Sequence, residues 1–76
     1  MKELLLYIAR NLVDHPDQVT VTEVGEADDL TLELRVAPED MGKVIGKQGR
    51  IAKAIRTVVK AAATKANIRV VVEIVQ

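Results

Sequence analysis

The stretch Val44-Ile45-Gly46-Lys47-Gln48-Gly49-Arg50-Ile51 decides the fold, because it places two glycines three positions apart between two predicted helices. Glycine carries no Cβ, so the backbone of a ligand can approach the chain closely at this turn. The free amides at the start of the second helix also favour phosphate. Positive charge gathers at the same place, on Lys43, Lys47, Arg50 and Lys53. The segment therefore predicts a loop that binds a sugar-phosphate backbone.

The charge of the chain supports this interpretation, although the net charge is zero. Residues 1–40 carry three basic against ten acidic side chains, whereas residues 41–76 carry eight basic side chains against Glu73 alone. A helix built only for solubility would mix the two signs, because oppositely charged pairs one turn apart stabilise it. The asymmetry indicates a surface that faces a polyanion.

Composition excludes several classes of function for these 76 residues, which suffice for one small core. Cysteine and serine are absent, and His15 is the single histidine, so we expect neither an enzyme, nor a metal site, nor a cofactor. Tyr7 is the only aromatic residue, which argues against a platform of stacked rings. The apolar run of residues 4–9 is too short for a signal peptide or a membrane span, so we expect a cytoplasmic chain without membrane insertion.

Hydrophobic periodicity predicts the first half of the fold. Residues 3–13 place apolar side chains on one helical face, and the helix should stop at His15-Pro16. Residues 19–25 and 30–36 are rich in Val, Thr and Leu, and the second run alternates as a strand with one buried face. The residues between these runs, 25–29, predict a loose antiparallel hairpin.

The second half contains two helices and a strand. Pro38 marks a helix start, and that helix should end near Gly46; a second helix should run from about Gly49 to Ala66. Its expected inward stripe is Ile51, Ile55, Val58 and Ala62. Residues 68–75 form a third strand, which the crossover makes parallel to the second. The predicted fold class is α+β, in the order α-β-β-α-α-β, with three helices packed on one face of a three-stranded mixed sheet.

Residues 44–51, together with Ile55, resemble the signature of the KH domain, a family of RNA-binding modules. The order of elements resembles the type II, bacterial-type KH fold, and the resemblance spans most of the chain. Residues 1–76 are therefore expected to be a single KH domain, similar to the small stand-alone bacterial KH proteins of the KhpA type.

The resemblance implies a site and a mechanism. KH loops of the G-x-x-G form clamp the backbone of about four single-stranded nucleotides, while the bases lie in an adjoining apolar groove. Carried over, the clamp would be Gly46, Lys47, Gln48 and Gly49. Ile45 and Ile51 would line the groove, Arg50 and Lys53 would hold phosphates with Lys43 nearby, and the strand at Arg69, Val70 and Val71 would face the bases.

The resemblance also implies partners and a cellular role. It predicts an RNA chaperone or post-transcriptional regulator that forms a homodimer, a complex with a larger KH-domain protein of the KhpB type, or both. It further links the chain to cell shape and cell-wall homeostasis. A short footprint gives a physical reason for association, because joining two modules raises the effective concentration of each for one RNA.

Two other classes stay open. A helix-turn-helix-like DNA-binding module also has a basic second helix after a short helix and a turn, although it seldom needs two glycines there. A protein-interaction module would give the basic residues no role beyond solvation. A phosphate-binding Walker loop is rejected, because Gln48 stands where a Ser or Thr should bind magnesium.

Overall fold

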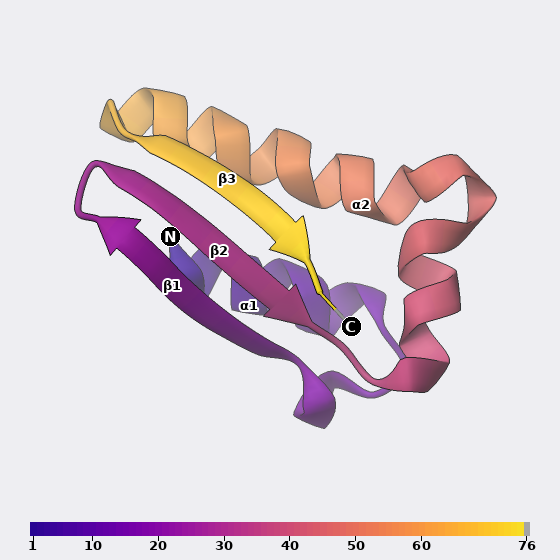
Figure 1. The fold of residues 1–76 in the computed structure, drawn as a ribbon. Helices are drawn as coiled ribbons and strands as arrows, with labels where there is room; N and C mark the ends of the chain where they lie inside the picture. The colour runs from indigo at the N-terminus through magenta and orange to yellow at the C-terminus, as the bar shows by residue number, and fades with distance from the viewer. Residues whose placement is uncertain (76) are drawn as a thin grey trace.

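The computed structural model describes residues 1–75, apart from the side chains of Lys47 and Gln48. Its elements are α1 (Lys2–Leu12), the single-turn 3-10 helix η1 (Pro16–Gln18), β1 (Thr20–Glu26), β2 (Asp29–Arg35), α2 (Pro38–Ala66) and β3 (Arg69–Ile74). α2 is one continuous helix that bends sharply into two arms (Figure 1). With each arm taken as one helix, the predicted order α-β-β-α-α-β is confirmed, and η1 is an addition.

The three strands form one mixed sheet in the order β1-β2-β3. β1 pairs with β2 antiparallel, and β2 pairs with β3 parallel, with Leu30 opposite Val70 and Leu32 opposite Val72. The parallel pair follows from the length of α2, which carries the chain back to the end of the sheet where β2 began. β3 is therefore an edge strand, with α2 running beside it (Figure 1).

The hairpin between β1 and β2 is tighter than the sequence indicated. The strands remain paired as far as Glu26 and Asp29, so only two residues form the turn. Gly25 has a φ of +117°, and a Cβ there would collide with the carbonyl oxygen of Asp29. The predicted five-residue loop is thus wrong in length, because Gly25 takes its unusual conformation within the paired strand.

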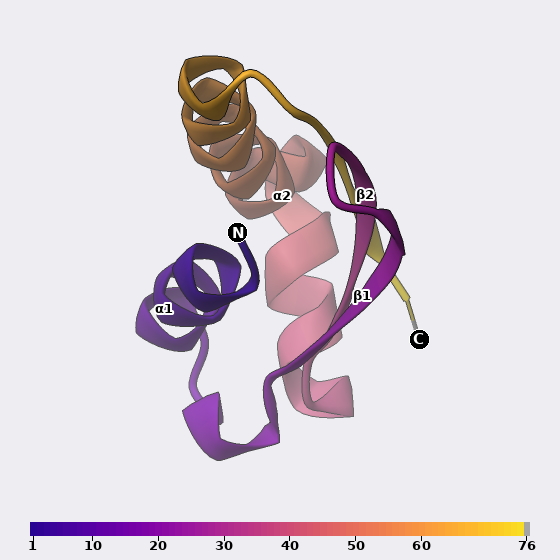
Figure 2. The ribbon, with the colours of Figure 1, turned by 90° about the vertical axis from the view of Figure 1, so that its left-hand side faces the viewer.

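The core lies between the sheet and the helices on one of its faces, where α1 and the second arm of α2 pack side by side (Figure 2). It is built from the buried residues Leu5, Ala9, Val19, Val21, Leu32, Leu34, Ile55, Val59 and Val72. The expected inward stripe of α2 is partly wrong, since Val58 is 45% exposed whereas Val59 and Ala63 are buried. The buried face is rotated by about one residue, to Ala52, Ile55, Val59 and Ala63.

The bend in α2 is located at the second glycine of the pair. Gly49 has a left-handed φ of +69°, whereas Gly46 does not have a positive φ. The first helix therefore does not end at Gly46 as expected, and the change of direction occurs three residues later. α2 ends in a Schellman motif, in which Asn67 is left-handed and the amide of Ile68 donates to the carbonyl of Ala63 at 3.0 Å.

A buried carboxylate fixes the first arm of α2 to the rest of the chain. Asp40 is 1% exposed, and its two oxygens accept hydrogen bonds from the backbone amides of Asp14 and His15, each at 3.0 Å. Lys43 pairs with the carboxylate of Asp14 at 3.3 Å beside it. These contacts join the α1–η1 connection to the arm that leads to the two glycines.

Candidate nucleic-acid interface

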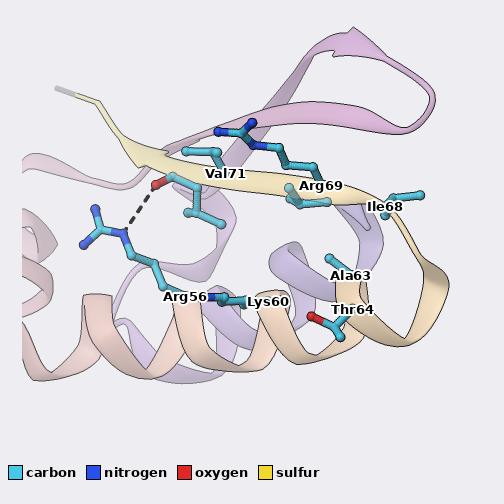
Figure 3. Close-up of a pocket in the computed structure, with 9 residues that line it drawn as sticks. Arg56, Lys60, Ala63, Thr64, Ile68, Arg69 and Val71 are labelled. Carbon is cyan, nitrogen blue, oxygen red and sulfur yellow. Dashed lines mark hydrogen bonds between the residues drawn. The ribbon is translucent and has the colours of Figure 1, made fainter.

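An open groove runs between the second arm of α2 and the edge strand β3. Its larger hollow has a volume of about 400 Å³. The helix contributes Arg56, Lys60, Ala63 and Thr64, and the chain around β3 contributes Ile68, Arg69, Val70, Val71 and Val72. Figure 3 shows the side chains of Arg56 and Lys60 on the helix side of this hollow. The hollow thus combines cations from the helix with aliphatic surface and main chain from the strand.

A second hollow of about 340 Å³ continues the groove toward the bend. It is lined by Ile45, Gly49, Ala52, Lys53, Arg56 and Ile74. Arg56 lines both hollows, so they are neighbouring parts of one groove that reaches from the bend along the second arm. The groove has aliphatic floors and cations along its helical side, which suits bases inside and phosphates along the rim.

The spacing of the helix explains this arrangement. Lys53, Arg56 and Lys60 lie three and four residues apart, so they project from one face of the second arm. Ala52 and Ala63 are buried between this face and the sheet. Because their side chains are small, the groove keeps its depth between helix and strand.

The wall formed by β3 presents main-chain groups. The amide of Arg69 donates to the carbonyl of Asp28, and the amide of Val75 donates to the carbonyl of Leu34, so these residues point their polar groups toward β2. Val70 and Val72 lie between these residues along the strand. Their main-chain N–H and C=O groups point the opposite way, toward the open edge of the sheet. The carbonyl of Val72 accepts a hydrogen bond from Nε of Arg56 at 3.4 Å, across the groove (Figure 3).

The structure places some of the predicted site residues in the groove and others in a separate hollow near the bend. Ile45, Gly49 and Lys53 lie in the groove, and Arg69, Val70 and Val71 lie at its far part. A separate hollow of about 150 Å³ is lined by Gly42, Lys43, Gly46, Arg50 and Ile51. Ile45 and Ile51 are therefore not brought together, since Ile51 also packs against the core whereas Ile45 is 49% exposed.

The remaining predicted residues differ in how they are placed. The side chains of Arg69 and Val71 lie on the side of β3 away from α2 (Figure 3), so they reach the groove only at its rim. Lys43 is held by Asp14 beside the third hollow. The side chains of Lys47 and Gln48, which the sequence assigns to the clamp, lie outside the described part of the structure.

The two glycines have open surroundings. A Cβ added at Gly46 or at Gly49 would meet no described atom within 4 Å. Gly49 needs its left-handed φ for the bend, but Gly46 has neither a positive φ nor a close neighbour that would require glycine. Packing among the described residues therefore does not explain Gly46, and the lack of a Cβ lets a ligand backbone approach closely there.

Sequence reasoning missed Arg56 and Lys60 as site residues. It placed Arg50 and Lys53 in the site, whereas the groove follows Lys53, Arg56 and Lys60. The signal was present in the spacing, because Arg56 stands three residues after Lys53 and four before Lys60. What the sequence lacked was the rotation of the helix on the sheet, which decides which of two adjacent faces meets β3.

Other kinds of site find no support in the part of the chain that the structure describes. No group of three or more His, Cys, Asp or Glu side chains there could hold a metal ion. No helix there is long and apolar enough to cross a membrane.

Comparison with known proteins gives one family. The family model described as "KhpA/KhpB, KH domain" matches residues 2–74. The chain is 71% identical over 75 residues to the RNA-binding protein KhpA of Clostridium acetobutylicum, covering 99% of this chain and 100% of that protein. It is 63% identical over 75 residues to the protein of that name in Caldanaerobacter subterraneus subsp. tengcongensis, again covering 99% and 100%.

A more distant relative matches over the full length as well. The RNA-binding protein KhpA of Listeria monocytogenes is 51% identical over 76 residues, which covers 100% of both chains. These relatives are named for binding and not for a reaction, in agreement with the expectation that the chain is not an enzyme. No solved structure matches the chain.

Proposed function

Because this chain belongs to the KhpA/KhpB family of KH domains, we propose that residues 1–76 form a single non-catalytic domain that binds single-stranded RNA. The observation that carries the proposal is the groove, which starts at a glycine bend with open surroundings and continues between cations and an edge strand. The names of the relatives supply RNA as the polyanion.

The mechanism follows from the two parts of this surface. The RNA backbone approaches the chain at Gly46 and Gly49, where the absence of Cβ atoms allows close contact, and Lys47 and Gln48 complete the clamp. Lys53 and Arg50 neutralise phosphates on either side of the bend. The bases enter the groove, where Ile45, Ala52 and Ile74 offer aliphatic surface.

The finer parts of the proposal concern the cell. A KH loop clamps about four nucleotides, and so short a footprint favours association with a second KH domain. We expect a homodimer, a complex with a larger KH-domain protein of the KhpB type, or both. The cytoplasm is the expected compartment, and the expected activity is that of an RNA chaperone acting in post-transcriptional control of cell shape and cell-wall homeostasis.

The test is a titration of fluorescently labelled random single-stranded RNA, read by anisotropy, with the chain and with the double variant Lys47→Asp/Gln48→Asp. We expect the variant to lose RNA binding, because two carboxylates replace the clamp between the glycines and repel phosphate. Circular dichroism and the melting temperature should stay close to those of the parent, because a bend with open surroundings contributes little to the core.

A matched control separates the clamp from general charge. The variant Lys2→Asp/Gln18→Asp makes the same chemical changes on α1 and η1, and it should bind RNA nearly as the parent does. Equal affinity of the parent and the Lys47→Asp/Gln48→Asp variant would refute the clamp. Tighter binding of duplex DNA than of RNA would support the helix-turn-helix alternative, and no binding to either would support a protein-interaction module.

A further inference from the structure

Arg56 occupies a special place in the groove. It is the residue common to the two hollows, which hold Lys53 and Ile45 on one side and Lys60 and Ile68 on the other. Its Nε donates to the carbonyl of Val72, so the side chain reaches from α2 to the edge strand (Figure 3). Any base that passes from one hollow to the next must therefore lie against this guanidinium.

The hydrogen bond orients Arg56 without using its main binding capacity. A guanidinium has five N–H donors and no acceptor, and the contact with Val72 occupies only the one on Nε. Among the described residues, no carboxylate forms an ion pair with Arg56. The two terminal nitrogens thus keep their donors for a ligand, in a planar fork whose direction the strand helps to set.

Two lysines already supply charge beside this position. Lys53 precedes Arg56 by three residues in the second hollow, and Lys60 follows it by four in the first. Both can serve phosphates as flexible point charges. Arg56 lies between them and differs in its planar, oriented fork. Binding phosphates along the rim of the groove does not need such a fork.

Resting on the proposed function, we propose that Arg56 selects the base at the junction of the two hollows, and that it favours a base with two adjacent acceptor atoms. The guanidinium fork pairs with guanine through O6 and N7, the commonest specific contact that arginine makes with a base. Cytosine offers the same pattern through O2 and N3 on its Watson–Crick edge, which is free in a single strand. On their Watson–Crick and Hoogsteen edges adenine and uracil place a donor beside each acceptor, so they pair with only one arm of the fork.

The test compares four labelled octamers in anisotropy titrations at one salt concentration: UUGUUGUU, UUCUUCUU, UUAUUAUU and the all-uridine strand. The repeated substitution brings the varied base to the junction in several binding registers. We expect the guanine or the cytosine octamer to bind at least about fivefold more tightly than the adenine and uridine octamers, as a bidentate contact implies. Which of the two is preferred identifies the acceptor edge that is read.

Two variants decide whether Arg56 is responsible. Arg56→Lys keeps the positive charge and removes the fork, so the four affinities should become equal within about twofold while the uridine octamer binds as before. Lys60→Gln removes a neighbouring cation, so it should weaken all four affinities by a similar factor and leave their ratios unchanged. Circular dichroism of both variants establishes that they are folded.

The outcomes separate this proposal from the one on which it rests. Equal affinity of the parent chain for all four octamers, or full discrimination retained in Arg56→Lys, would overturn the role of Arg56. If, in the same experiment, Lys47→Asp/Gln48→Asp lost RNA binding, the proposal that the clamp binds RNA would still stand. If that double variant bound every octamer as tightly as the parent, the proposed function itself would fail.

Discussion

At the scale of single residues, the fold requires glycine at position 25 but not at position 42. Gly25 has a φ of +117°, and a Cβ there would collide with the main chain of Asp29. Gly42 lies within the first arm of α2 without a positive φ, and a Cβ there would meet nothing within 4 Å. Packing and conformation require the first glycine but not the second.

This contrast gives a pair of opposite stability effects. Gly25→Ala should lower the free energy of unfolding by about 2 kcal/mol, because strain or a displaced strand must accommodate the methyl group. In a domain of this size that corresponds to a fall in melting temperature of roughly 8–16 °C. Gly42→Ala should raise the stability by about 0.5–1 kcal/mol, because alanine is the better helix former. Thermal unfolding followed by circular dichroism measures both effects. If Gly25→Ala melted at the same temperature as the parent, glycine would not be required at position 25.

Asp40 supports a second prediction about stability. Asp40→Ala should cost about 2–3 kcal/mol, because the backbone amides of Asp14 and His15 lose their charged acceptor. The neighbouring Glu39 is the control: its side chain is 63% exposed and lies 3.7 Å from His15. Glu39→Ala should therefore change the stability by less than about 0.5 kcal/mol. Urea unfolding of the two variants tests the difference, and similar midpoints would show that Asp40 does not hold the connection in place.

At the scale of elements, the sequence predicted what depends on local periodicity. Leu30, Leu32 and Leu34 alternate with polar residues; Leu32 and Leu34 are buried in the core, and Leu30 is half-buried. Pro16 ends the first helix region, and α1 indeed stops at Leu12. These features follow from hydrophobic alternation and from the backbone limits of proline, which act within a few residues.

The sequence could not predict how α2 is rotated on the sheet. Two adjacent helical faces both carried apolar residues, one with Val58 and one with Val59, and only packing against β2 and β3 selects between them. The contact of Arg56 with Val72 joins residues sixteen positions apart, and it depends on that rotation. The proposed clamp could be predicted from the sequence because the spacing of its residues is local, whereas the place of Arg56 and Lys60 in the groove depends on tertiary packing.

The second arm of α2 should determine how RNA binding depends on salt. Each phosphate contact contributes about one to the slope of log affinity against log salt. Lys53→Gln and Arg50→Gln should each reduce the slope by about one, because these residues lie on the two sides of the bend. Lys65→Gln is the control, since Lys65 is exposed and lines none of the three hollows. Affinities measured at several salt concentrations test this, and a slope unchanged in Lys53→Gln would exclude a phosphate contact there.

At the scale of the whole molecule, the small size of the chain limits how firmly it can hold RNA alone. The described residues have a radius of gyration of 11.8 Å and form one groove beside one bend. A single footprint of about four nucleotides offers few contacts. Two domains that share one RNA bind it more tightly, because the second contact forms at a high effective concentration.

The proposed dimer therefore predicts a dependence on RNA length. An RNA of about sixteen nucleotides should bind at least about tenfold more tightly than one of four. At the same protein concentrations, sedimentation velocity should show a dimer. At dilutions where the protein is a monomer, the longer RNA should bind only slightly more tightly than the shorter one. The remaining small factor reflects the larger number of positions at which one domain can bind the longer strand. A length effect of the same size in the monomer would show that association plays no part.

The main-chain wall of the groove has a consequence for how this binding surface can change during evolution. Along β3 the side chains point either into the core or to the outer face of the sheet, whereas the polar groups at Val70 and Val72 face the groove. Every amino acid except proline carries those groups, so mutational drift along β3 leaves the main-chain part of this wall unchanged. Changes of ligand preference should therefore accumulate on the helix side, and a deep mutational scan should find the preference encoded in α2 and tolerance at the outward positions of β3.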